Sequence, residues 1–254
     1  MDFPGLDMLL FLIISGFIAA FIDSVVGGGG LISLPALLMA GLPPSLSLGT
    51  NKLGSTMSSL TSTASFLFSG KIKLGLVLAL FPLSFAGSVL GTYTVKLMPP
   101  EFLKPIVVIL LFLVTIYTLL KKNWGKDSVY RPLTAWKKVG TAAAAFIIGF
   151  YDGFFGPGTG SFLLFLFLLV GFDFVSASAN AKVLNLASNL ASLITFFLLK
   201  SVHIGYGLPM GLAMIAGALA GSQVAIRQGA KYVKPLFIIV TLLLVGKQLW
   251  DLLH

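Results

Sequence analysis

The sequence predicts an all-α, polytopic helical membrane protein built from two inverted repeats with glycine-broken helices. Three observations lead to this fold class: a very apolar composition, apolar segments of membrane-spanning length, and an internal repeat. Of the 254 residues, 57% are hydrophobic and only 10% are charged, and the mean hydropathy is +1.02. A soluble domain carries about 25% charged residues, so the composition excludes an ordinary soluble fold.

The composition also excludes several kinds of chemistry. The chain has no cysteine, and its only histidines are His203 and His254. Disulfides, thiol catalysis and clusters of cysteine or histidine around a metal are therefore excluded. We expect no cofactor, no metal and no enzymatic activity. The net charge of +9 comes largely from lysine and arginine in short loops between apolar segments, as in membrane proteins, so we expect no nucleic-acid partner.

Ten apolar segments follow one another along the chain. A straight helix needs about 20 residues to cross the hydrocarbon core of a bilayer. Two segments, at 31–40 and 160–170, are too short to cross comfortably. The other eight approach the required length and lie at about 8–26, 46–69, 74–97, 103–121, 139–155, 180–199, 207–226 and 235–252.

Each short segment follows a glycine-rich run that we expect to break the helix. The runs are Gly27-Gly28-Gly29-Gly30 and Gly156-Pro157-Gly158-Thr159-Gly160. Glycine lacks a side chain and proline lacks an N–H group, so neither run stays helical. Non-helical backbone is tolerated at membrane depth only where protein or a water-filled cavity surrounds it. Both breaks should therefore lie inside the helix bundle.

A polar linker divides the chain almost in half. Its six lysine and arginine residues predict a cytoplasmic location, because positive charge accumulates on that side of the membrane. We therefore expect a first transmembrane repeat at 1–120, a cytoplasmic basic linker at 121–138 and a second transmembrane repeat at 139–254.

Rare residue types recur in the same order in the two halves. Before the breaks the matched residues are 129 positions apart, and after the breaks they are 130 apart, which places one extra residue at the second break. Chance does not align aspartate, lysine and proline in order, so the halves form an internal repeat. The matches include Asp23 with Asp152, Gly27 with Gly156, Lys52 with Lys182, Gly91 with Gly221, and Lys104-Pro105 with Lys234-Pro235.

The distribution of basic residues favours an inverted arrangement of the repeats. If each half crosses the membrane an odd number of times, eleven loop lysines and arginines lie inside and four outside. An even number of crossings gives ten inside and five outside. Inverted repeats with broken helices are typical of secondary transporters.

The two glycine breaks are candidate anion-binding elements. A helix that begins after a break offers free N–H groups and a favourable dipole to an anion. The alternative is that the glycines only allow close helix packing. The candidate substrate-binding residues in the breaks are Gly27, Gly28, Gly29, Gly30, Gly156, Pro157, Gly158, Thr159 and Gly160.

Two lysines within apolar segments are candidate ligands for an anion. Spacings of three and four residues place Lys182, Asn185 and Asn189 on one helix face, and Lys52, Ser55 and Ser59 repeat that spacing. An intramembrane lysine costs about 2.5–3.5 kcal/mol on insertion scales and carries a compact charge suited to an oxyanion. The alternative is a lysine that reaches the membrane interface. The candidate substrate-binding residues here are Asn51, Lys52, Ser55, Lys182, Asn185 and Asn189.

Asp23 and Asp152 each lie four residues before the first glycine of a break. A buried carboxylate needs a partner or a proton. Two roles are open for this pair: they could carry protons coupled to transport, or they could pair with a lysine or cap the loose backbone of the break. We favour the structural role.

These motifs resemble the sulfite exporter TauE/SafE family, also called the 4-toluene sulfonate uptake permease family. The resemblance rests on Asp23 to Gly30, on Gly49-Thr50-Asn51-Lys52-Leu53-Gly54-Ser55 and on Asp152 to Gly160. The second half departs from the motif, reading Ala179-Asn180-Ala181-Lys182. The resemblance implies a carrier of sulfur-containing anions in the inner or plasma membrane.

We therefore expect a multi-pass secondary transporter in the cell membrane that moves small, sulfur-containing organic or inorganic anions, such as sulfite or sulfonates, by alternating access. A passive anion channel is the alternative. The expected partners are a small anionic substrate and the lipid bilayer, and the sequence leaves a homodimer open.

Overall fold

A computed structural model describes residues 5–95 and 128–229, with positions 231–233, 235, 236, 238, 239 and 242 near the C-terminus. The predicted segment at 103–121, most of that at 235–252 and residues 121–127 of the linker lie outside the described residues. All helices named below are α-helices, which confirms the all-α fold class. They are α1 (Leu6–Val26), α2 (Gly30–Met39), α3 (Pro44–Phe68), α4 (Leu74–Thr94), α6 (Ala135–Phe154), α7 (Thr159–Val170), α8 (Phe174–Leu198) and α9 (Ile204–Gln228).

Four described helices, α1, α4, α8 and α9, are long and apolar enough to cross a membrane. α1 has 21 residues, and at about 1.5 Å per residue it matches a hydrocarbon core about 30 Å thick. Large apolar side chains such as Ile14, Leu78 and Leu212 remain exposed on the outside of the bundle. Such a surface is unfavourable in water and suits lipid.

The helix breaks occur where the sequence predicts them. α1 ends at Val26 and α2 begins at Gly30, whereas α6 ends at Phe154 and α7 begins at Thr159. Gly27, Gly28, Gly156 and Gly158 have φ values between 80° and 93°, a region that residues with a β-carbon rarely adopt. With 10 and 12 residues, α2 and α7 are too short to cross the membrane as straight helices.

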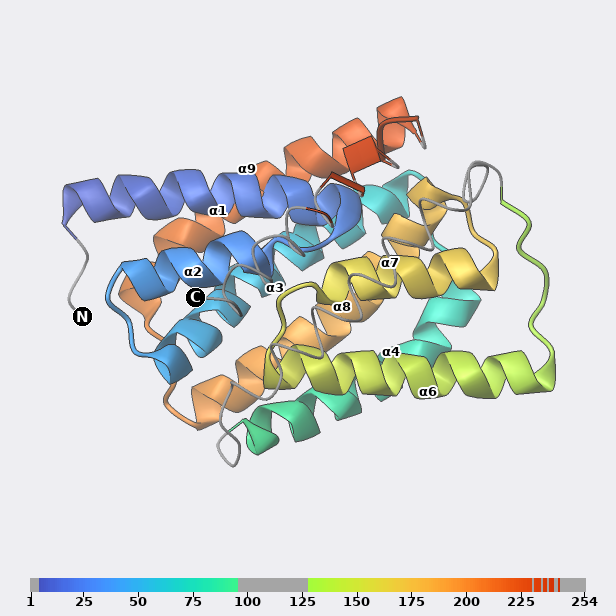
Figure 1. Cartoon of the computed structure of the whole chain (residues 1–254), viewed down its shortest axis with the longest axis horizontal. Helices are drawn as coiled ribbons and strands as arrows, with labels where there is room; N and C mark the ends of the chain where they lie inside the picture. Colours follow the sequence, from blue (N-terminus) through green and yellow to red (C-terminus); the bar gives the residue numbers. More distant parts are fainter. Residues whose placement is uncertain are drawn as a thin grey trace.

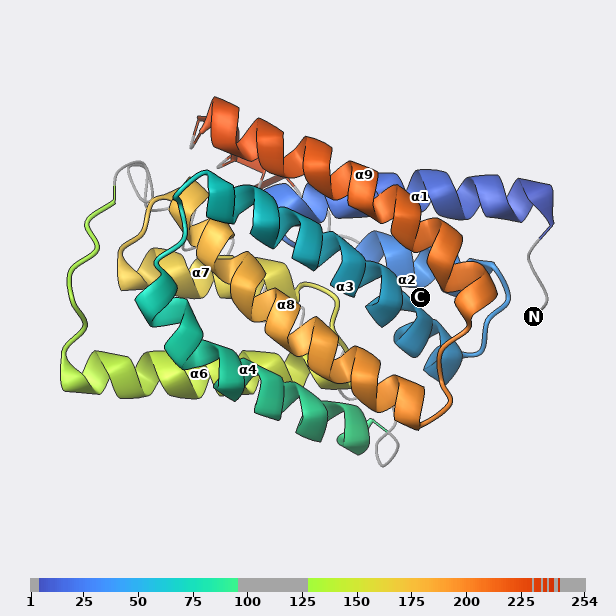
Figure 2. The same cartoon turned by 180° about the vertical axis from the view of Figure 1, so that it is seen from behind.

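The helices pack reciprocally between the two halves. α3 and α8 lie side by side at the centre, between α9 and α4 (Figure 2). α1 packs against α9, and its counterpart in the repeat, α6, packs against α4. In Figure 1, α1 and α6 start at opposite ends of the molecule and run in opposite directions. α1 and α4 of the first half therefore pack against α9 and α6 of the second half.

Glycines make this reciprocal packing close. A β-carbon built on any of four glycines would clash with the backbone of the facing helix, so only glycine allows the helices to approach this closely. The two contacts of α4 with α6 match the two contacts of α9 with α1 in the repeat. The pairs are Gly87 with Phe146, Gly91 with Phe150, Gly217 with Phe17, and Gly221 with Phe21.

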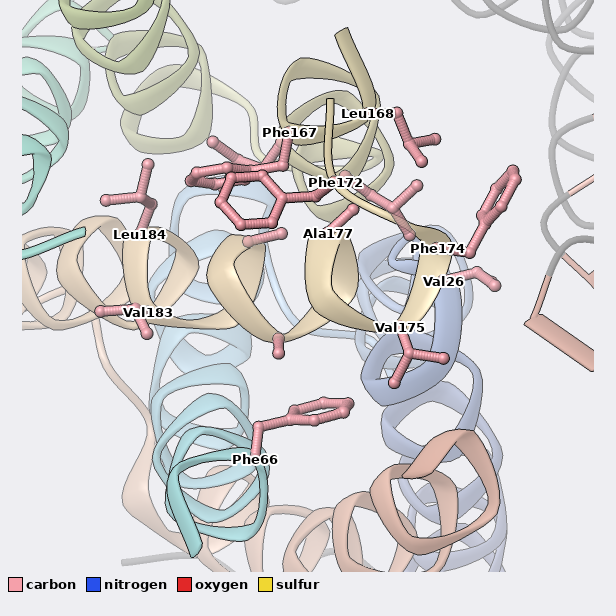
Figure 3. Packing of buried hydrophobic residues seen from close by; sticks show 14 of the residues in the cluster. Val26, Phe66, Phe167, Leu168, Phe172, Phe174, Val175, Ala177, Val183 and Leu184 are labelled. Atoms are coloured by element: carbon pink, nitrogen blue, oxygen red, sulfur yellow. The ribbon is translucent and has the colours of Figure 1, made fainter. Parts of the chain in front are cut away.

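Apolar side chains fill the space beside the breaks. The larger buried cluster gathers residues of α7 and the first half of α8, together with Val26 at the end of α1 and Phe66 of α3 (Figure 3). The rings of Phe167 and Phe172 meet edge to face with centroids 5.9 Å apart. This cluster fixes the position of α7, and hence of the second break, against α8.

We predict that Gly153→Val destabilises the protein. A β-carbon at Gly153 would meet the backbone of Ser88 in α4, and backbone cannot move aside as a side chain can. Overpacking costs about 1–3 kcal/mol, which should lower the unfolding temperature in detergent. Gly140→Val is the matched control, because it lies in the same helix and a β-carbon there meets nothing within 4 Å. Equal unfolding temperatures for the two variants would contradict the packing argument.

Candidate functional site

The two glycine breaks meet inside the bundle. A β-carbon at Gly27 would clash with the backbone of Gly160 and Ser161, and one at Gly160 would lie 2.7 Å from the Cα of Gly27. The hydroxyl of Ser161 donates to the carbonyl of Val26 at 3.1 Å. Two motifs that are 130 residues apart in the sequence thus form one structure.

Two ion pairs cross between the halves at this point, one buried on both sides and one whose carboxylate, that of Asp23, is 17% exposed. The Nζ of Lys52 in α3 lies 2.8 Å from Oδ1 of Asp152 at the end of α6. The Nζ of Lys182 in α8 lies 2.7 Å from Oδ2 of Asp23 near the end of α1. Each lysine therefore finds its carboxylate in the other half of the chain.

The burial of the lysines excludes the interfacial alternative in this structure. Lys52 is 3% exposed and Lys182 is 1% exposed, so neither ammonium group reaches the bundle surface. We expected cationic side chains facing a substrate, whereas the structure places a carboxylate against each. Removing one partner of a buried pair is costly because it leaves an uncompensated charge. The aspartates therefore hold the lysines in place.

A small polar cavity lies beside these pairs, and we call it the central cavity. Its volume is about 20 Å³, which is room for about one water molecule. An oxyanion such as sulfite, with four heavy atoms, does not fit there unless side chains move. The lining residues are Asp23, Gly28, Gly30, Asn51, Lys52, Ser55, Asp152, Gly156, Gly158, Thr159, Gly160, Asn185 and Asn189.

Most of the candidate residues line this cavity, but four do not. Gly27 and Gly29 form the tight turn of the first break, and Pro157 packs against Gly30, where a β-carbon would lie 3.3 Å from the proline Cα. Lys182 is behind Asp23, its ion-pair partner. The binding of a substrate by any of these residues remains a prediction.

The polar side chains that α3 and α8 place at the cavity differ in length. Lys52 donates a further hydrogen bond to Oδ1 of Asn189 at 3.1 Å. In the repeat Asn189 corresponds to Ser59, and Asn185 corresponds to Ser55. The second half thus contributes longer amide side chains to the cavity wall, whereas Asn51 of the first half corresponds to Ala181. The cavity is therefore not symmetric.

Two hydroxyl groups hold the second break, and the sequence analysis identified only that of Thr159. The hydroxyl of Tyr151 donates to the carbonyl of Pro157, and that of Thr159 donates to the carbonyl of Gly156 at 2.6 Å. Tyr151 corresponds to Ile22, and Thr159 is the extra residue of the second break. No repeat signal marked Tyr151, because its counterpart has no polar group.

The donors in this site suit an anion better than a metal. Among the described residues, no group of three or more histidine, aspartate or glutamate side chains is placed to hold a metal ion. Beside its two aspartates, the cavity combines a lysine, three asparagines, hydroxyl groups and glycine backbone. These groups offer hydrogen-bond donors, which an oxyanion accepts through its oxygens.

Comparison with known proteins gives consistent results. The chain matches the family model described as "Sulfite exporter TauE/SafE" over residues 12–247. It is 42% identical to "Probable membrane transporter protein ORF9" of Sinorhizobium sp, over 97% of this chain and 94% of that protein. It is 36% identical to a "Probable membrane transporter protein" of Haemophilus influenzae, over 97% and 96%. It is 35% identical to "Probable membrane transporter protein YfcA" of Escherichia coli K12, over 92% and 87%. No solved structure matches the chain.

We predict that Lys182→Met destabilises the protein and that adding Asp23→Asn recovers much of the loss. The single variant leaves the carboxylate of Asp23 without its cation, at a cost of about 3–5 kcal/mol, and the second change removes that charge. Unfolding temperatures of both single variants and the double variant in detergent complete the cycle. Lys71→Met, at an exposed loop lysine, is the control. Additive effects would show that the pair is not coupled.

Proposed function

Because the chain belongs to the sulfite exporter TauE/SafE family of membrane transporters, we propose that it is a secondary transporter of small, sulfur-containing anions, such as sulfite or sulfonates. The observation that carries this proposal is the convergence of both glycine breaks, of Lys52 and of both aspartates on one polar cavity, with Lys182 paired to one of those aspartates. A site built from both halves is suited to a protein that opens alternately to either side.

The arrangement of the helices supports alternating access by inverted repeats. α1 and α6 run in opposite directions (Figure 1), and α1 packs on α9 as α6 packs on α4. The two halves can then exchange roles, so that a movement which closes one side opens the other. In this proposal, residues 1–120 and 139–254 are the two repeats and residues 121–138 lie in the cytoplasm.

The anion replaces a carboxylate as the partner of a lysine. In this structure, the carboxylate of Asp152 binds the ammonium group of Lys52, in the position that the substrate takes in this proposal. An oxyanion offers Lys52 the same kind of charge-assisted hydrogen bond that Asp152 gives it, so it can take the place of this carboxylate. The amides of Asn185 and Asn189 and the hydroxyl of Ser55 complete its hydrogen bonds.

A transporter fits the cavity better than the alternative, a passive channel. A channel needs a continuous path, whereas the ion pairs and tightly packed glycine backbone leave this cavity room for about one water molecule. We propose a multi-pass protein of the inner or plasma membrane. Counterflow distinguishes the two functions, because only a carrier exchanges labelled substrate against an unlabelled excess on the other side.

We predict that Lys52→Ala and Lys182→Ala each lower the initial rate of anion counterflow. At Lys52, loss of a hydrogen bond to a charged group costs about 1.5–3 kcal/mol, which corresponds to a decrease of about 10- to 100-fold, and loss of Lys182 leaves the charge of Asp23 uncompensated beside the anion. The measurement uses proteoliposomes and labelled sulfite, with a panel of sulfonates, thiosulfate, sulfate and carboxylates.

Lys71→Ala serves as the matched control, since Lys71 is an exposed loop lysine outside the cavity. All three variants should still insert into membranes, and counterflow is compared at equal amounts of folded protein, because loss of Lys52 or Lys182 breaks an ion pair. Normal counterflow in both cavity variants would overturn the assignment of the site. Linear, non-saturating flux without counterflow would favour the channel.

A further inference from the structure

The two aspartates are equivalent in the repeat but have different surroundings. Both oxygens of Asp23 are engaged: Oδ2 pairs with Lys182, and Oδ1 accepts the N–H of Gly29 at 3.3 Å. Asp152 uses only Oδ1, against Lys52. Its Oδ2 is buried and has no hydrogen-bond partner.

This difference follows from how each break is held. In the first break, the carboxylate of Asp23 binds the backbone at Gly29. In the second break, Tyr151 and Thr159 bind the carbonyls of Pro157 and Gly156. Neither hydroxyl has a counterpart in the first half, where Ile22 stands for Tyr151. The second break therefore does not need its aspartate, and Oδ2 is left free.

The lysines of the two ion pairs also differ in the number of their side-chain partners. The ammonium group of Lys52 also donates to Asn189, so it keeps a partner when Asp152 leaves. The side-chain hydrogen bond of Lys182 is to Asp23. Removing the charge of Asp23 therefore weakens two interactions, one with Lys182 and one with the backbone N–H of Gly29. Neutralising Asp152 weakens only its interaction with Lys52.

From this asymmetry we infer that Asp152 is the one carboxylate of the pair that takes up a proton during transport, and that this proton admits the anion to Lys52. The inference rests on the proposed function and assigns its coupling ion. A proton on Oδ2 converts an unpartnered acceptor into a donor. A neutral carboxyl group also no longer repels the incoming anion.

Charge balance supports one proton for each single negative charge. Among the described residues, the charged groups of the cavity and its ion pairs are Asp152 on α6, Lys52 on α3, Asp23 on α1 and Lys182 on α8, which sum to zero. The neutral hydroxyl of Tyr151, next to Asp152 in the chain, adds no charge. An anion that enters alone leaves a net negative charge in a medium of low dielectric. An anion that enters with one proton leaves the sum unchanged. Transport should therefore accelerate as the pH on the loading side falls.

The first test compares the same substitution at the two equivalent positions. In proteoliposomes that contain a pH indicator, sulfite or a sulfonate transported by the unmodified protein should carry one proton per monovalent anion. We expect Asp152→Asn to abolish this proton flux and the pH dependence of any exchange that remains. Asp23→Asn should lower exchange without removing its pH dependence. Proton flux that persists in Asp152→Asn, or that is lost only in Asp23→Asn, overturns the inference.

The second test does not require a transported anion. Infrared difference spectra of the unmodified protein, recorded between neutral and acidic pH, should contain the carbonyl band of a buried, protonated carboxyl group. Asp152→Asn should remove the band, and Asp152→Glu, which keeps the charge, should shift it. Asp173→Asn, at the N-cap of α8, should leave it unchanged.

The two tests separate this inference from the proposed function. If no anion in the panel is transported but the band follows Asp152, the proposed function fails and the order of protonation stands. If the band follows Asp23, or if Asp152→Glu leaves it in place, the inference is wrong whatever the protein transports.

Discussion

The fold depends on neutralising two lysines inside a membrane. An isolated charge in a medium of low dielectric is strongly unfavourable, and each lysine finds its carboxylate only in the other half. Neither half can therefore bury its own lysine when it stands alone. The two ion pairs connect α3 with α6 and α8 with α1. The need to neutralise the lysines therefore determines how the halves associate.

The glycine breaks follow from this requirement. Asp23 and Asp152 lie in the last turns of α1 and α6, helices that stop inside the bundle. For these helices to stop there, the chain must turn back within protein, and the positive φ values of Gly27 and Gly156 provide the turn. Gly27 also leaves room for the backbone of Gly160, and Gly156 leaves room for the ammonium group of Lys52. One set of small residues thus serves both the turn and the contact between halves.

The sequence predicted the broken helices, the repeat and most of the residues around the cavity, because each is a local pattern of hydropathy, glycine or spacing. It did not predict which charges pair. The repeat aligns Asp23 with Asp152 and Lys52 with Lys182, whereas the contacts run crosswise, and only the arrangement of the halves in space determines that. Tyr151 was also missed, since a lone tyrosine in an apolar helix looks like a packing residue until the carbonyl of Pro157 lies beside it.

The differences between the halves bear on the direction of transport. If two repeats were identical, the states open to either side would have the same energy and an identical site. Here Asn51 faces a cavity whose other half has Ala181 at the equivalent position, and Asn185 and Asn189 stand where the first half has serines. In the proposed function, an anion held by these amides meets different groups in the two open states, because α3 and α8 present different side chains. The two states would then bind the anion with different affinities, and detailed balance requires that the empty and the loaded protein favour the two states to different extents, because the gradients across the membrane supply the whole driving force of a secondary transporter.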